Sequence, residues 1–156
     1  MFKVAILMGS DSDLPIMEKA TVALKEFKIP FEVKILSAHR TPNEVAVFAK
    51  KARKNGFGII IAGAGGAAHL PGFIAAYTEL PVIGVPVPTG HLEGYDALLS
   101  IVQMPQGVPV ATVAIGNAYN AGILAAQILG LKHTTFLNRV AEFKKKLRKK
   151  VLRACK

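Results

Sequence analysis

A histidine and an arginine stand side by side in the segment LSAHRTP, at residues 36–42. The segment follows an apolar run and precedes a helix start that Thr41 already caps, so folding requires neither side chain there. Imidazoles such as that of His39 exchange protons near neutral pH, and no Asp or Glu lies within three residues of Arg40 to pair with its guanidinium. The pair predicts proton transfer beside a bound phosphate, although a lone loop histidine is also typical of an ordinary surface residue.

A second polar segment, GSDSDLP at 9–15, opens another expected helix. Ser10 and Ser12 offer hydroxyl groups where free backbone N–H groups and the helix dipole favour an anion. Asp13 would repel a phosphate, and its carboxylate is better suited to the hydroxyls of an attached sugar. The alternative is that Ser12 or Asp13 is simply a helix cap.

The third segment, GAGGAAHLPG at 63–72, combines four glycines with small alanines. It lacks the Gly-Lys-Ser/Thr of a Walker A loop, and it follows the third expected strand instead of the first, where a dinucleotide fingerprint belongs. Ala64, Gly65 and Gly66 leave room for a small, weakly polar species beside His69. Tight helix–sheet packing and a structural histidine explain the same residues equally well.

The sequence lacks the residue patterns that several classes of reaction require. The four histidines, at 39, 69, 91 and 133, have none of the spacings expected of a zinc site. The single cysteine, Cys155, lies next to the end of the sequence, where neither a disulfide framework nor a nucleophile is expected. No serine sits in a Gly-x-Ser-x-Gly elbow. We therefore expect neither a metal nor a covalent hydrolase mechanism.

The elements that position these segments follow from the apolar pattern. Near-continuous apolar runs predict strands buried on both faces, at residues 3–8, 31–36, 57–62, 82–87 and 108–115. Helical segments are expected between and after them, beginning near residues 14, 42, 70, 95 and 120, with TPNE at 41–44 as a capping box. This alternation predicts a three-layer αβα sandwich with a parallel sheet. In the flavodoxin-like order 2-1-3-4-5, the loops after the first three strands meet at one crevice.

The charge of the chain is concentrated in its tail. The 156 residues carry a net charge of +10, but residues 132–156 hold ten Lys or Arg against one Glu. Apolar residues at 136, 140, 143, 147 and 151 predict an amphipathic helix that packs by one face, and contact with nucleic acid or membrane is the less favoured alternative. We expect one domain, with a core at 1–131, in a soluble cytoplasmic protein, since no apolar run approaches the roughly 18 residues of a membrane span.

Five segments in order resemble the PurE family of purine biosynthesis: MGSDSD (8–13), SAHRTP (37–42), AGAGGAAHLPG (62–72), PVIGVPV (81–87) and SIVQMPQGVPVATVAIG (100–116). The resemblance implies an isomerase that moves the carboxylate of N5-carboxyaminoimidazole ribonucleotide from nitrogen to ring carbon C4. The last segment resembles the mutase type more than the type that carboxylates aminoimidazole ribonucleotide directly with CO2. The resemblance also implies a homo-octamer and a reaction without ATP, biotin or metal.

The resemblance further implies a role for each site residue. Ser10, Ser12 and Arg40 would hold the 5'-phosphate, Asp13 the ribose hydroxyls, and His39 would be the general acid and base. CO2 would be retained in a Gly/Ala pocket at residues 64–68, beside Ser37 and Ala38. Ala64, Gly65, Gly66, His69 and Leu70 are also expected to bind the substrate. The loops at 86–94 and 104–110 are expected to reach a neighbouring subunit's site.

One segment departs from the family pattern. GNAYNAGILAAQIL at 116–129 is about two residues shorter than the pattern, and Tyr119 interrupts its small residues. Two other classes of function stay open: a non-catalytic flavodoxin-like domain that binds FMN or another phosphorylated ligand, and a nucleic-acid binder that uses the tail. The three loops offer no aromatic ring to stack on a flavin, which favours the enzyme.

Overall fold

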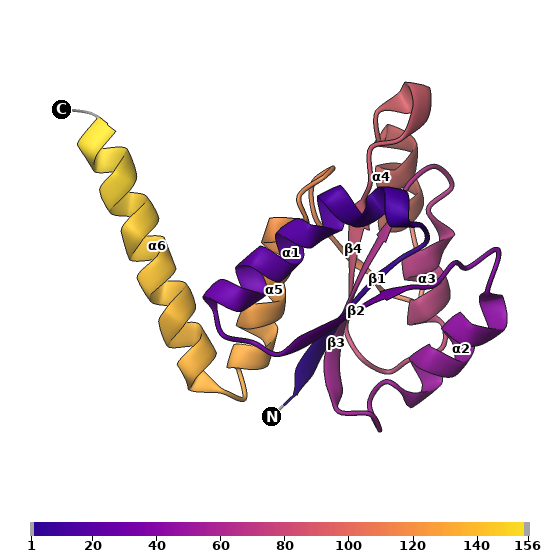
Figure 1. Ribbon diagram of the computed structural model, residues 1–156, viewed down its shortest axis with the longest axis horizontal. Coiled ribbons are helices and arrows are strands. Elements are labelled where there is room, and N and C mark those ends of the chain that lie inside the picture. The colour runs from indigo at the N-terminus through magenta and orange to yellow at the C-terminus, as the bar shows by residue number, and fades with distance from the viewer. Residues whose placement is uncertain (1, 155–156) are drawn as a thin grey trace.

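The computed structural model describes residues 2–154, and five parallel strands form its single described sheet (Figure 1). The strands are β1 (Lys3–Met8), β2 (Phe31–Ile35), β3 (Phe57–Ala64), β4 (Val82–Pro86) and β5 (Ala111–Thr112). Their order is β2-β1-β3-β4-β5, and each neighbouring pair is parallel. The predicted fold class and strand order are confirmed.

Helices cover both faces of the sheet. They are α1 (Leu14–Glu26), α2 (Pro42–Lys51), α3 (His69–Ala75), α4 (Tyr95–Val102), α5 (Ala118–Gly130) and α6 (Thr134–Ala154), with 3-10 turns at Asp11–Asp13 and Gly90–Leu92. Buried side chains of α1 and α5 form the core on one face, and those of α2, α3 and α4 form the core on the other. Successive residues of the central strands alternate between these two cores, which explains why their sequences are apolar throughout.

The two edge strands differ from the prediction. In β2, Val33 and Ile35 remain 40% and 51% exposed, because an edge strand is covered less than a central one. The expectation of burial on both faces is therefore wrong for β2. Only Ala111–Thr112 pairs in the segment predicted as a strand at 108–115. Pro109 lacks the N–H that a ladder requires, although the flanking Val110 and Val113 still pack against opposite cores.

The predicted capping box at the start of α2 is not formed. Pro42 is the first helical residue, as expected, but the Thr41 side chain makes no cap hydrogen bond. Its hydroxyl instead accepts from the Ser37 N–H at 2.9 Å and donates to the Ser37 carbonyl at 3.1 Å. Thr41 thus closes the loop that carries His39 and Arg40. The helix ends at Lys51.

The segment that departs from the family pattern, at 116–129, forms most of α5. Asn117 caps α5 by accepting from the Asn120 N–H at 3.1 Å, so the helix begins at Ala118, before the predicted start. The Tyr119 hydroxyl donates to the Glu26 carboxylate at 2.7 Å. Burial and the adjacent Glu26 raise the pKa of Tyr119 to about 12. Tyr119 therefore ties α5 to the end of α1.

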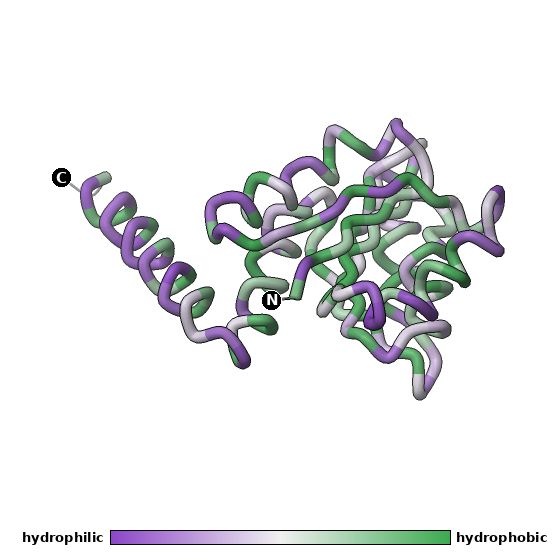
Figure 2. The backbone as a smooth tube through the Cα atoms, turned by 60° about the horizontal axis from the view of Figure 1, so that its bottom comes forward, coloured by the Kyte–Doolittle hydropathy of each residue, from purple (hydrophilic) through white to green (hydrophobic). Residues whose placement is uncertain are grey.

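The last helix leaves the body of the domain, as Figures 1 and 2 show. Phe136 and Val140 are buried, and Phe143 packs edge-on against Phe27 with ring centroids 5.7 Å apart. Further along, Leu147 is 47% exposed. The amphipathic helix is correctly predicted, but its apolar face packs only over its first half. No helix among residues 2–154 is long and apolar enough to cross a membrane. Cys155 lies outside the described residues.

Candidate active site

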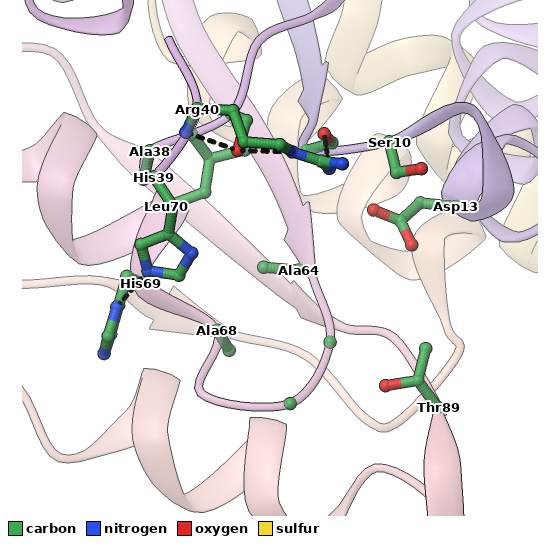
Figure 3. A pocket seen from close by; sticks show the side chains of 14 residues that line it. Ser10, Asp13, Ala38, His39, Arg40, Ala64, Ala68, His69, Leu70 and Thr89 are labelled. Carbon is green, nitrogen blue, oxygen red and sulfur yellow. Dashed lines mark hydrogen bonds between the residues drawn. The ribbon is translucent and has the colours of Figure 1, made fainter. Parts of the chain in front are cut away.

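The loops after β1, β2 and β3 meet in a pocket of about 250 Å³ at the carboxyl ends of the strands (Figure 3). The pocket is lined by every residue predicted for the site except Ser12. It also includes Ala68, from the predicted Gly/Ala pocket at 64–68, together with Gly9 and Thr89, which were not predicted. Parallel strands bring these loops together because all their carboxyl ends lie at one edge of the sheet.

The first loop is organised by Ser10. Its hydroxyl oxygen accepts from the Ser12 N–H at 3.3 Å and its hydroxyl donates to the Asp11 carboxylate at 3.1 Å. Ser10 is therefore the cap of the 3-10 turn, whereas the Asp13 side chain makes no cap hydrogen bond to α1. Asp13 occupies the N-cap position of α1, as the alternative held, but it makes no side-chain cap hydrogen bond, and Ser12 is not a cap. Ser12 is exposed outside the pocket, and its side chain hydrogen-bonds the Asp13 carboxyl.

Asp13 is a buried carboxyl group at the pocket wall, with 7% of its surface exposed. Burial raises its pKa above the ordinary value. Hydrogen bonds from the backbone of Ser10 and Gly9, together with the positive charge of Arg40, oppose that rise. A carboxyl group in this setting can accept hydrogen bonds from ligand hydroxyls inside the pocket.

Arg40 connects the second loop to the first. Its Nη2 donates to the Gly9 carbonyl at 2.9 Å, and its Nε donates to the Ser37 hydroxyl at 3.4 Å. The Ser37 hydroxyl also accepts from the Arg40 backbone N–H at 3.2 Å. These contacts fix the guanidinium plane at the mouth of the pocket and leave other N–H groups for an anion. No acidic residue lies close to Arg40 in the sequence, but Asp13 lies close to it in space.

The two histidines of the site form a pair. His39 Nε2 lies 2.5 Å from His69 Nδ1, and the two rings are nearly perpendicular, at 86°. His69 is the first residue of α3, and it follows Ala68, whose φ of +48° is left-handed. Both histidines are predicted site residues, but their contact depends on this unusual turn, which the sequence pattern does not predict.

Small residues of the third loop form the wall opposite the charged groups. A Cβ atom at Gly65 would lie 2.5 Å from the Thr89 Oγ1 atom and 3.1 Å from the Val87 carbonyl oxygen. Only glycine permits this approach of the third loop to the segment after β4. The signal for Thr89 was its position after a fourth parallel strand, whose carboxyl end faces the same crevice.

Metal ligands do not gather in the described part of the chain. Within residues 2–154, no three His, Cys, Asp or Glu side chains form a group that could hold a metal ion. The pocket instead combines a fixed cation, a buried carboxyl, an imidazole pair and an apolar wall. This set can bind a phosphorylated sugar and move a proton beside a small ligand.

Comparisons with known proteins agree on one family. The model of the AIR carboxylase family matches residues 3–150. The N5-carboxyaminoimidazole ribonucleotide mutase of Thermotoga maritima is 59% identical over 97% of this chain and 89% of its own length. The protein of the same name from Pyrococcus horikoshii is 57% identical over 95% of this chain and 84% of its own. The crystal structure of Treponema denticola PurE superimposes with a TM-score of 0.90 at 30% identity, covering 98% of this chain and 96% of that one.

Proposed function

Because the chain belongs to the AIR carboxylase family, the PurE family, we propose that it is an N5-carboxyaminoimidazole ribonucleotide mutase of purine biosynthesis. This isomerase moves a carboxylate from the exocyclic nitrogen N5 to ring carbon C4. The observation that carries the proposal is the single pocket that joins His39 to Arg40, Asp13 and a wall of small residues. High identity to relatives with the mutase name favours this activity over direct carboxylation.

The nucleotide is held at the charged end of the pocket. Arg40 and Ser10 bind the 5'-phosphate, with Ser12 at the rim, and Asp13 accepts from the ribose hydroxyls. The fixed guanidinium of Arg40 and the burial of Asp13 support these roles. This arrangement directs the imidazole ring of the substrate toward His39.

The reaction moves one carboxylate and one proton. The N5–carboxylate bond breaks, CO2 is released inside the pocket, and N5 receives a proton from His39. C4 then attacks the retained CO2, a carbon–carbon bond forms, and His39 removes the C4 proton to restore the aromatic ring. Per turnover, one proton passes from C4 to N5, and no other reactant is consumed.

Retention of CO2 depends on the apolar wall. Ser37, Ala38, Ala64, Gly66 and Leu70 line the part of the pocket proposed to hold the gas. Holding CO2 against C4 makes the recombination effectively unimolecular, which is worth several kcal/mol, on the order of the advantage of well-oriented reactants. No cofactor is required by this sequence of steps.

Absorbance assays test the function directly. The purified protein is given synthetic N5-carboxyaminoimidazole ribonucleotide without ATP, and in parallel aminoimidazole ribonucleotide with bicarbonate. We expect conversion of the first substrate and its loss, by about 10²- to 10⁴-fold, in His39→Asn, the range that general acid–base catalysis supplies. Activity with the second pair alone identifies a direct carboxylase, the reaction in the family's name. Inactivity with both refutes the enzyme and returns attention to a phosphorylated-ligand-binding domain.

Two other classes of function are less well supported. No Phe, Tyr or Trp lines the described pocket, so a flavin would lack an aromatic partner there. A nucleic-acid role would rest on α6 alone. It would be supported only if removal of residues 132–156 abolished nucleic-acid binding.

We further propose a cytoplasmic homo-octamer in which residues 1–156 act as one domain, with the loops at 86–94 and 104–110 bordering a neighbour's site. Exposed apolar side chains support an assembly: Tyr95 and Leu99 of α4 are 64% and 55% exposed, and Leu147 of α6 is also uncovered. Light scattering coupled to size-exclusion chromatography tests the number of copies, and a monomer at micromolar concentration would contradict the assembly.

A further inference from the structure

Thr41 stands where α2 needs a cap, but its hydroxyl group is turned back into the preceding loop. The hydroxyl oxygen accepts from the Ser37 N–H at 2.9 Å, the hydroxyl donates to the Ser37 carbonyl at 3.1 Å, and the side chain makes no cap hydrogen bond to the helix. A threonine cap at this position usually stabilises a helix. The Thr41 hydroxyl therefore shapes the loop at 37–41 instead of the start of α2.

Ser37, at the other end of this loop, has each of its polar groups engaged within the loop. Besides the Thr41 hydroxyl, the Thr41 backbone N–H donates to the Ser37 carbonyl at 2.9 Å. The Ser37 hydroxyl oxygen accepts from the Arg40 backbone N–H at 3.2 Å and from Arg40 Nε at 3.4 Å. Only 9% of Ser37 is exposed, so water replaces these bonds poorly. Loss of the Thr41 hydroxyl would leave the Ser37 N–H without its acceptor.

The residues between the two ends of the loop all belong to the main pocket. They line it in succession: Ala38, His39 and Arg40. In Figure 3 the Arg40 guanidinium extends from this loop toward Ser10, and the His39 imidazole extends to the other side, toward His69. One short loop thus presents a cation to one end of the pocket and an imidazole to the other. If the loop opened at Thr41, both groups would move together.

We propose that Thr41 is a positioning residue: its hydroxyl closes the loop at 37–41 through contacts within the chain alone, and so holds Arg40 for the phosphate and His39 for the substrate ring. The kinetic part of this inference rests on the proposed mutase function. Its anion-binding part requires only that the pocket accepts a phosphate group. Donors that are already held in place bind an anion more tightly, because the loop does not have to be ordered when the anion arrives.

Substitutions at Thr41 and a matched control separate positioning from fold stability. Thr41→Val keeps the shape of the side chain and removes the hydroxyl, Thr41→Ala is a second variant without the hydroxyl, and Thr41→Ser keeps it. Thr21→Val makes the same change in α1, away from the residues that line the main pocket. The Thr21 hydroxyl donates to the Glu18 carbonyl at 2.8 Å, and Thr21 is 7% exposed, so the control also loses a buried hydrogen bond.

NMR titration with inorganic phosphate measures the anion site without any turnover, and Arg40→Met gives the value for a pocket without the guanidinium. We expect the Kd for phosphate to rise about threefold to tenfold in Thr41→Val and Thr41→Ala, the effect of about one hydrogen bond. Thr41→Ser and Thr21→Val should bind phosphate as the wild type does. In the Arg40→Met background, Thr41→Val should add no further loss, because the group that Thr41 positions is absent.

Kinetics with N5-carboxyaminoimidazole ribonucleotide give the second readout. We expect Thr41→Val to raise KM and to lower kcat, with a loss in kcat/KM of about tenfold to a hundredfold, because a misplacement of about 1 Å can cost a hundredfold. Thr41→Ser should recover most of this loss, and Thr21→Val should keep the wild-type kcat and KM. Urea denaturation at the assay temperature establishes that each variant is folded.

Four results would overturn the proposal. They are wild-type phosphate binding in Thr41→Val, equal losses of kcat/KM in Thr41→Val and Thr21→Val, additive losses of phosphate binding in the double variant with Arg40→Met, and no phosphate binding by the wild type. If the wild type binds phosphate but has no mutase activity, the proposed function fails, while the phosphate titrations still decide the role of Thr41.

Discussion

Replacing Arg40 tests whether the charged end of the pocket recognises a phosphate. The guanidinium has five N–H donors, of which one at Nη2 and one at Nε bond to Gly9 and Ser37. Three donors remain, enough for a bidentate contact. Charge-assisted hydrogen bonds contribute about 1.5–3 kcal/mol each, and the lower figure suits a pocket open to solvent. Two such bonds give about 3 kcal/mol, or about two orders of magnitude in kcat/KM.

The assay compares two substrates and three proteins. Wild type, Arg40→Lys and Arg40→Met are each measured with N5-carboxyaminoimidazole ribonucleotide and with the corresponding riboside, which lacks the phosphate. We expect Arg40→Met to lose about a hundredfold with the ribonucleotide, and Arg40→Lys an intermediate amount, because an ammonium cannot make the planar bidentate contact. With the riboside, the variants should differ little from wild type.

The measurement with the riboside distinguishes phosphate recognition from a structural effect. A loss of the same size with both substrates would refute phosphate recognition, since the effect would then come from the tie that Arg40 makes between the first two loops. Urea denaturation of each variant measures this structural effect separately. We expect the free energy of unfolding to fall by about 1 kcal/mol because of the lost hydrogen bonds.

Three further substitutions test other parts of the structure. Since burial raises the Asp13 pKa, the contribution of Asp13 to folding stability is lost as pH rises through that pKa. Asp13→Asn should therefore raise Tm at pH 7, and this gain in Tm should disappear as pH falls toward the ordinary pKa of 3.8. The KM of the same variant should rise about tenfold or more. A Tyr119→Phe variant loses the hydrogen bond to Glu26, and calorimetry should show Tm about 2–4 °C lower with unchanged kcat. In Gly65→Ala the new Cβ meets Thr89, so denaturation should show a loss of about 1–3 kcal/mol that Thr89→Ala partly restores; full stability of the single variant would contradict the close approach.

Local sequence patterns were sufficient for the parallel strands and for the loops that form the pocket, whereas the strand order was taken from the flavodoxin-like architecture. Buried parallel strands have long apolar runs, and each run ends in a polar or glycine-rich loop whose place in the fold follows from the strand order. Edge effects were harder to predict, since the exposure of Val33 and Ile35 depends on what covers β2.

Predictions failed where one group had two possible partners. The Thr41 hydroxyl was assigned to the α2 cap from its spacing, yet it bonds to Ser37 within its own loop. Similarly, the contact between His39 and His69 joins residues 30 positions apart. It requires the left-handed turn at Ala68, which no propensity of alanine predicts.

The length of α6 explains why its apolar face is only half covered. At 1.5 Å per residue its 21 residues span about 31 Å, whereas the 13 residues of α5 span about 20 Å. The helix therefore extends beyond the partner that it packs against, and Leu147 lies past the contact between Phe143 and Phe27. Basic residues surround this overhang, and Leu147 and Leu152 on it are 47% and 53% exposed. This division of the helix follows from relative lengths, which the periodicity of the sequence alone does not reveal.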